Sequence, residues 1–110
     1  MSRTVLVKYQ VKEESADANQ HLVEQVFQQL HAEDPGGLRY ATLRLADGVT
    51  FVHIALIEGD DDPLSRLSAF GEFRQGLEDR VADGPGRTDA TLVGAYRFLT
   101  PCPTEAAGKK

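Results

Sequence analysis

The sequence predicts an α+β fold, a ferredoxin-like β-α-β-β-α-β sandwich in which two helices cover one face of an antiparallel sheet. Segments with period-two alternation occur in this order with two stripes of helical spacing. Asp47-Gly48 stands between two of the alternating segments, which is a strong hairpin signal. Right-handed crossovers then place both helices on one face, and the expected strand order is 4-1-3-2.

The first half of the chain supplies a strand and a helix. Val5 to Val11 alternates between apolar and polar side chains, as a strand does. Ser15 is expected to cap a helix whose apolar stripe reaches Leu30, because its hydroxyl can accept from the first free amides. Pro35-Gly36-Gly37 ends this helix.

A hairpin follows. Leu38–Ala46 and Val49–Glu58 are predicted strands, and the two residues between them predict a type I′ turn with positive φ at both positions. A two-residue loop fixes the register and therefore the faces. The expected opposite pairs are Arg44 with Phe51, Thr42 with His53, Tyr40 with Ala55, Leu45 with Thr50, Leu43 with Val52, and Ala41 with Ile54.

The second half predicts a helix and a last strand. Asp62-Pro63 can start a helical turn, and an apolar stripe predicts a helix over Ala69–Val81, with Ser68 as a possible cap. Ala90–Phe98 is the expected fourth strand. We therefore expect a single domain over residues 1–99 and a flexible tail over 100–110.

The register sorts the hairpin into two faces of different character. The aliphatic face is expected to form the core beneath the helices, and it comprises Ala41, Leu43, Leu45, Val52, Ile54 and Leu56. The mixed face is expected to be left uncovered by the helices, and it comprises Tyr40, Thr42, Arg44, Phe51, His53 and Ala55. An apolar patch rimmed by polar groups indicates an interface, so we expect a homodimer through this sheet face.

Composition excludes several classes of function. The net charge of -5 disfavours a nucleic-acid partner, and no apolar run is long enough to cross a membrane. The N-terminus has no signal-peptide core, so the expected location is the cytoplasm. A single cysteine, Cys102, excludes an intrachain disulfide. His21 and His31 are too far apart along a helix to bind one metal ion, so no metal site and no cofactor are expected.

The chain resembles the dimeric α/β-barrel proteins, and within them the antibiotic-biosynthesis-monooxygenase-like group. The resemblance covers about residues 3–98 and rests on the Asp-Gly hairpin, the Phe51-Val52-His53 strand, the Asp62-Pro63 helix start, Ala69–Phe73 and Val93–Phe98. It implies a homodimer, and known members include cofactor-free oxygenases of aromatic polyketides and quinols, haem-degrading enzymes and isomerases. The haem-degrading branch uses an Asn, a His and a Trp. This sequence has no Trp, and its one Asn, Asn19, falls on the first helix, which sets haem degradation aside.

His53 is the candidate catalytic residue, because a neutral imidazole can take a proton from a phenol or donate a hydrogen bond to it. Tyr40, Thr42, Arg44 and Phe51 are candidate substrate-binding residues, with Arg44 able to stabilise an anion. These residues predict a cofactor-independent monooxygenase-like protein with a small aromatic or quinol-type substrate. Two alternatives stay open: His53 can be a hydrogen-bonded interface residue, and the protein can be a non-catalytic small-molecule-binding or structural homodimer.

Overall fold

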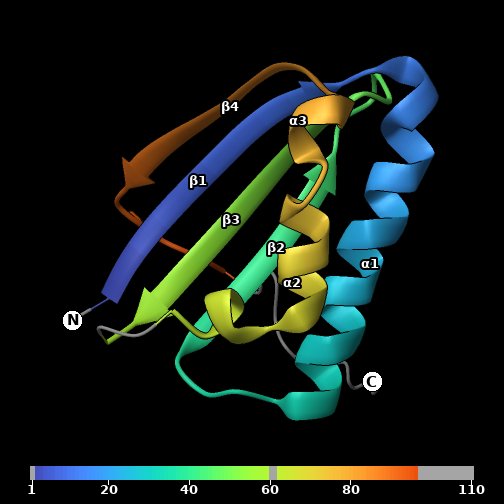
Figure 1. Ribbon diagram of the computed structural model, residues 1–110. Coiled ribbons are helices and arrows are strands. Elements are labelled where there is room, and N and C mark those ends of the chain that lie inside the picture. Colours follow the sequence, from blue (N-terminus) through green and yellow to red (C-terminus); the bar gives the residue numbers. More distant parts are fainter. Residues whose placement is uncertain (1, 60–61, 97–110) are drawn as a thin grey trace.

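The computed structural model describes residues 2–59 and 62–96. The element order β-α-β-β-α-β is confirmed, with the second helix in two pieces (Figure 1). Two short 3₁₀ turns, η1 (Glu13–Ser15) and η2 (Pro63–Arg66), precede the helices. The main elements are β1 (Ser2–Val11), α1 (Ala16–Glu33), β2 (Leu38–Arg44), β3 (Thr50–Glu58), α2 (Ser68–Arg74), α3 (Leu77–Arg80) and β4 (Val81–Ala90).

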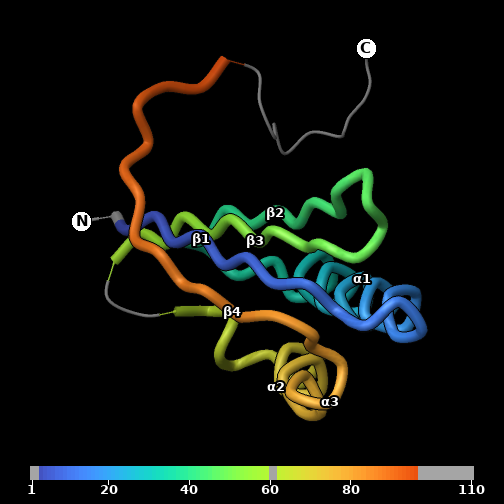
Figure 2. The backbone as a smooth tube through the Cα atoms, turned by 90° about the horizontal axis from the view of Figure 1, so that it is seen from above, coloured from blue at the N-terminus to red at the C-terminus, as the bar shows by residue number. Residues whose placement is uncertain are grey.

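The four strands form one sheet in the order β2-β3-β1-β4, and all three neighbouring pairs are antiparallel. This is the predicted order 4-1-3-2 read from the other edge. All three helices lie on one face of the sheet, while the chain that follows β4 leaves toward the opposite side (Figure 2). Over residues 2–59 and 62–96 the fold is thus two layers, with no helix on the second face of the sheet.

The hairpin register is confirmed, with Thr42 opposite His53 and Arg44 opposite Phe51. The type I′ turn is wrong. Gly48 has a φ of 81°, whereas no positive φ occurs at the preceding aspartate. Five residues, 45–49, connect the two strands, and the Gly48 amide donates to the Leu45 carbonyl at 2.9 Å. This longer loop keeps the pairing that the two-residue loop predicted.

The helix predicted over Ala69–Val81 is interrupted. Gly76 adopts a φ of 82° between α2 and α3, and a left-handed residue cannot continue a right-handed helix. Asp62 caps η2 as expected, since its side chain accepts from the Leu64 amide at 3.0 Å. Ser15 occupies the N-cap position of α1, but its side chain makes no capping hydrogen bond.

The fourth strand was predicted too late in the chain. β4 ends at Ala90, residues 91–96 form no strand, and the rest of the predicted segment lies outside the described residues, as does the predicted tail 100–110. Gly84-Pro85 lies within β4, where the register of β4 against β1 shifts. β4 is an edge strand, and edges and bulges are where a sheet accommodates proline.

The two faces of the hairpin are the reverse of those predicted. Phe51 and His53 are 1 % and 6 % exposed beneath the helices, whereas Leu43 and Leu45 on the aliphatic face are 41 % and 38 % exposed. The aromatic residues of the mixed face supply the volume of the core, and its polar groups pair with one another, so their burial carries little penalty. The aliphatic face is therefore the uncovered one.

Candidate functional site

A buried polar cluster lies between the sheet and the helices, with His53 of β3 at its centre. The Nε2 atom of His53 lies 2.7 Å from the Tyr9 hydroxyl of β1. Its Nδ1 atom lies 2.6 Å from the Tyr40 hydroxyl and 3.1 Å from the Thr42 hydroxyl, both on β2. The two strands that flank β3 thus place hydroxyl groups around both ring nitrogens.

The helices complete this polar cluster from the other side. Asn19 of α1 is fully buried, and its Nδ2 donates to the Tyr9 hydroxyl at 3.0 Å. Arg80 of α3 donates from Nε to the Asn19 Oδ1 at 3.0 Å. Arg80 is held in place by the end of α2, since its Nη2 donates to the Phe73 carbonyl at 2.6 Å. The cluster therefore links every layer of the fold.

Aromatic rings enclose the polar groups. His53 stacks on Tyr9 with ring centroids 5.3 Å apart and contacts Phe73 at 5.4 Å. Phe51 stacks on the far side of this group, 5.8 Å from Tyr9. Tyr40 stacks on Phe27 of α1 at 5.1 Å. The rings pack against one another and against the imidazole, so they enclose the polar groups within the core.

Burial sets the charge state of the cluster. Burial lowers the pKa of His53 to about 4, so the imidazole is neutral at pH 7. Burial raises the pKa of Tyr9 to about 12, against the opposing effects of the Asn19 hydrogen bond and the Arg80 charge. Burial likewise raises the pKa of Tyr40 above its ordinary value. The three groups are thus uncharged, and hydrogen bonds hold them together.

The structure brings most of the predicted site residues together. Tyr40, Thr42 and His53 are in direct contact, and Phe51 joins them through Tyr9. They meet beneath the helices and not on the uncovered face, which corrects their predicted position.

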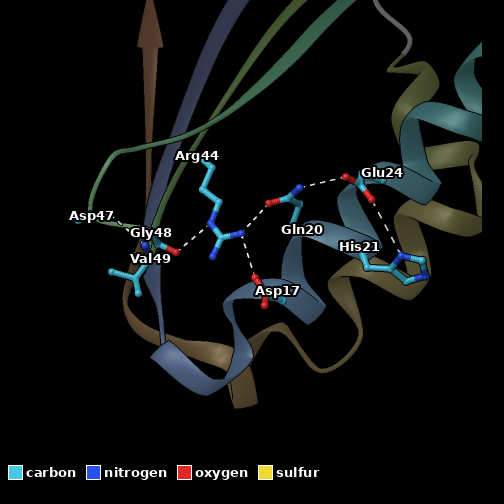
Figure 3. A network of polar contacts seen from close by, with 8 residues as sticks. All are labelled: Asp17, Gln20, His21, Glu24, Arg44, Asp47, Gly48 and Val49. Atoms are coloured by element: carbon cyan, nitrogen blue, oxygen red, sulfur yellow. Dashed lines mark hydrogen bonds and ion pairs between the residues drawn. The ribbon is translucent and has the colours of Figure 1, made fainter.

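Arg44 is directed elsewhere (Figure 3). Its guanidinium donates to Gln20 at 2.6 Å and to Asp17 at 3.1 Å on the first turns of α1, and its Nε donates to the Gly48 carbonyl at 2.9 Å. It also lies over the Phe51 ring, 5.6 Å from the centroid. Arg44 therefore joins the hairpin to α1 at the rim, and the cationic side chain of the buried cluster is Arg80.

Sequence reasoning missed Tyr9, Asn19 and Arg80 as members of the site. Asn19 carried a usable signal, because it occupies the same helical face as Ala16 and Val23, where an apolar residue is expected. Tyr9 carried a weaker one, as the polar-tipped member of an otherwise valine-rich strand face. No sequence signal marked Arg80, because its position depends on the break between α2 and α3 at Gly76.

The part of the chain that the structure describes contains no cluster of His, Cys, Asp or Glu side chains that could hold a metal ion. None of its helices is long and apolar enough to cross a membrane.

The chain has a ferredoxin-like α+β fold, with a buried polar and aromatic cluster between the sheet and the helices. Several solved structures have a similar fold. A "putative antibiotic biosynthesis monooxygenase" from Nitrosomonas europaea superposes with a TM-score of 0.70 at 19% identity, over 84% of this chain and 90% of that one. A protein of the same description from Caulobacter crescentus gives 0.69 at 14% identity, over 84% and 91%.

A conserved protein from Methanosarcina mazei has the same fold, with a TM-score of 0.67 at 15% identity over 82% of this chain and 91% of that one. No protein-family model matches the sequence, and no curated protein matches it. The chain has the ferredoxin-like fold of the antibiotic-biosynthesis-monooxygenase-like proteins, as its sequence predicted.

Proposed function

We propose that this protein is a cofactor-independent monooxygenase-like enzyme that oxidises a small aromatic or quinol-type substrate at the His53 cluster. One observation carries the proposal: a neutral histidine is hydrogen-bonded at both ring nitrogens to tyrosine hydroxyls inside an aromatic-walled interior. The similarity in fold to proteins described as antibiotic biosynthesis monooxygenases supports it.

The proposed oxidation requires few groups from the protein. The anion of a quinol or of a related phenol is electron-rich enough to reduce dioxygen directly. The substrate supplies all four electrons that dioxygen takes up: two accompany the oxygen atom that enters the product, and two, with two protons of the substrate, reduce the other oxygen atom to water. The site must orient the ring, exclude water and manage the proton of the substrate hydroxyl, which the neutral imidazole and its hydroxyl partners are able to do. His53 is the proposed catalytic residue, and Tyr40, Thr42 and Phe51 are the proposed substrate contacts.

We also propose that the protein works as a homodimer through the uncovered sheet face. Leu43 and Leu45 are large apolar side chains that stay about two-fifths exposed on that face. They adjoin the half-buried Val52 and Ile54 of β3. A contiguous aliphatic surface of this kind is costly to leave in water, and a second copy offers the complementary surface.

The non-catalytic alternative rests on how closed the cluster is. His53 is 6 % exposed and Tyr9 2 %, and protein groups already occupy both imidazole nitrogens. A purely structural network would have this appearance. A binding protein would differ from an enzyme in being stabilised by a phenolic ligand while consuming no oxygen.

Oxygen uptake tests the proposal. Quinols, naphthoquinols and anthrones are added to the protein in an oxygen electrode, and thermal stabilisation by each compound is measured alongside. We expect at least one compound to give both effects, and we expect His53→Gln to abolish the uptake. His31→Gln, which changes an exposed histidine on α1, is the matched control and should retain it. If a compound stabilises the protein but none causes oxygen uptake, the binding protein is favoured. If no compound gives either effect, the proposed site is refuted.

A further inference from the structure

The hydrogen bonds of the cluster form one continuous chain across the fold. It runs from Arg80 through Asn19, Tyr9 and His53 to Tyr40, over distances of 3.0, 3.0, 2.7 and 2.6 Å. Its members come from α3, α1, β1, β3 and β2 in that order. A series of hydrogen bonds that begins at a cation has a fixed direction from donor to acceptor, and this direction can be deduced from Arg80.

The arginine fixes the first two links. A guanidinium has donors only, so the atom of Asn19 that faces it must be the carbonyl oxygen. The amide nitrogen of Asn19 must then face Tyr9 and donate to its hydroxyl oxygen. No other assignment of the Asn19 oxygen and nitrogen satisfies Arg80.

The tyrosine fixes the third link. Tyr9 is 2 % exposed and has one hydroxyl proton, and among the described residues the recorded acceptor within reach is Nε2 of His53. A neutral imidazole that accepts at Nε2 carries its proton on Nδ1. That proton points at the Tyr40 and Thr42 hydroxyls.

We infer that Arg80 and Asn19 are positioning residues that hold His53 in the Nδ1–H tautomer and make the Tyr40 end of the chain a hydrogen-bond donor. The inference rests on the proposed function and narrows its substrate class. A hydrogen-bond donor at Tyr40 suits a substrate that binds through an anionic oxygen, as in a phenolate or an enolate. In the resting state His53 thus donates from Nδ1 toward the Tyr40 and Thr42 hydroxyls, and Tyr40 is the group that donates to the substrate.

The two tyrosines keep their protons along this series of hydrogen bonds. Burial raises the pKa of Tyr9 to about 12 against the smaller, opposing effect of the Arg80 charge. Burial likewise raises the pKa of Tyr40, and the charge of Asp62 adds to this to a smaller extent. Tyr40 therefore stabilises a substrate anion by donating a hydrogen bond and does not transfer its proton, which leaves the anion able to react with dioxygen.

Nitrogen NMR tests the tautomer without any substrate. In the full chain carrying His21→Gln and His31→Gln, His53 is the remaining histidine, and a long-range ¹H–¹⁵N spectrum distinguishes the protonated from the unprotonated ring nitrogen. We expect the proton on Nδ1. A proton on Nε2 would overturn the inference, whatever the protein's activity.

Asn19→Asp gives a stronger form of the same test. A carboxylate at this position has acceptors only, so it keeps the contact with Arg80 but takes the Tyr9 proton. Tyr9 then accepts from His53, and we expect the His53 proton to move to Nε2. An unchanged spectrum from a folded variant would show that position 19 does not set the tautomer.

Turnover distinguishes positioning by Arg80 from a structural role. We expect Arg80→Met to lower kcat by about 10²-fold with little change in KM, as for loss of a positioned hydrogen-bond donor to an anion, and Arg80→Lys to recover part of it. Arg74→Met is the matched control, since Arg74 also lies over a phenylalanine, Phe70, and should leave kcat unchanged. Equal loss in Arg80→Met and Arg74→Met would overturn the role of Arg80. Absence of turnover in the wild type would refute the proposed function while leaving the tautomer result standing.

Discussion

Tyr9 and His53 are 44 residues apart in the sequence, and their side chains meet at 2.7 Å in the interior of the fold. Their strands are neighbours in the sheet, and Tyr9 also stacks on the imidazole at 5.3 Å. The pair therefore joins the hydrogen-bond chain to the aromatic core. Much of the behaviour expected of this protein follows from that one contact.

Removing the Tyr9 hydroxyl should destabilise the fold. Tyr9→Phe leaves the Asn19 amide and the His53 Nε2 without their shared partner in a buried site, which costs about 2 kcal/mol of unfolding free energy. Tyr40→Phe is the comparison, because Tyr40 is half-buried and Thr42 still bonds to Nδ1, so a loss of about 1 kcal/mol is expected. Urea titration measures both. Equal losses would mean that Tyr9 is not the central link.

Acid should destabilise the protein through His53. Its pKa is about 4 in the folded state and about 6.5 when unfolded, so the unfolded chain binds more protons between these values. Stability is therefore full above pH 6.5 and is lost as the pH falls toward 4, by up to about 3 kcal/mol.

His53→Gln should remove this part of the pH dependence, and His31→Gln should leave it in place. Thermal unfolding between pH 4 and pH 7 measures the effect. A wild-type profile that is flat across this window would contradict the buried neutral state of His53.

The two faces of the hairpin should respond differently to a charge. Phe51→Asp buries a carboxylate in the core and should unfold the chain, because Phe51 is 1 % exposed. Leu43→Asp places the carboxylate on the uncovered face and should leave a folded monomer. Circular dichroism reports the fold and light scattering the mass. A wild-type monomer at micromolar concentration would refute the dimer.

Two glycines provide a matched pair for the hairpin loop. Gly48 has a φ of 81°, so Gly48→Ala should cost about 1 kcal/mol. Gly71 lies inside α2 with open space around it, so Gly71→Ala should stabilise by about 0.5–1 kcal/mol. Chemical denaturation compares the two variants. The same sign for both would mean that the loop backbone differs from the one described.

Local patterns in the sequence predicted the order of elements, the strand order and the pairing of Thr42 with His53. These depend on periodicity and on one turn, which neighbouring residues determine. The choice of buried face was wrong, because side-chain type alone favoured the aliphatic set. What decided it were the hydrogen bonds of Tyr9 to His53 and to Asn19, which bring together three elements distant in the sequence.

Two further errors have a similar origin. The fourth strand was predicted over Ala90–Phe98, but β4 covers Val81–Ala90 and includes Gly84, at a register shift where a Cβ atom would come within 3.1 Å of the Lys8 carbonyl oxygen. The break at Gly76 that positions Arg80 depends on tertiary packing. The candidate residues on the hairpin could thus be predicted, whereas those supplied by β1, α1 and α3 required the assembled fold.

Isotope labelling tests the central claim, that the His53 cluster inserts oxygen into an aromatic substrate, most directly. The active compound from the oxygen-electrode panel is incubated with the protein under ¹⁸O₂, and the product mass is measured for wild type, His53→Gln and His31→Gln. We predict one ¹⁸O atom per product molecule in the wild type and in His31→Gln, and none above the protein-free background in His53→Gln. Oxygen derived from water, or full labelling by His53→Gln, would contradict the claim.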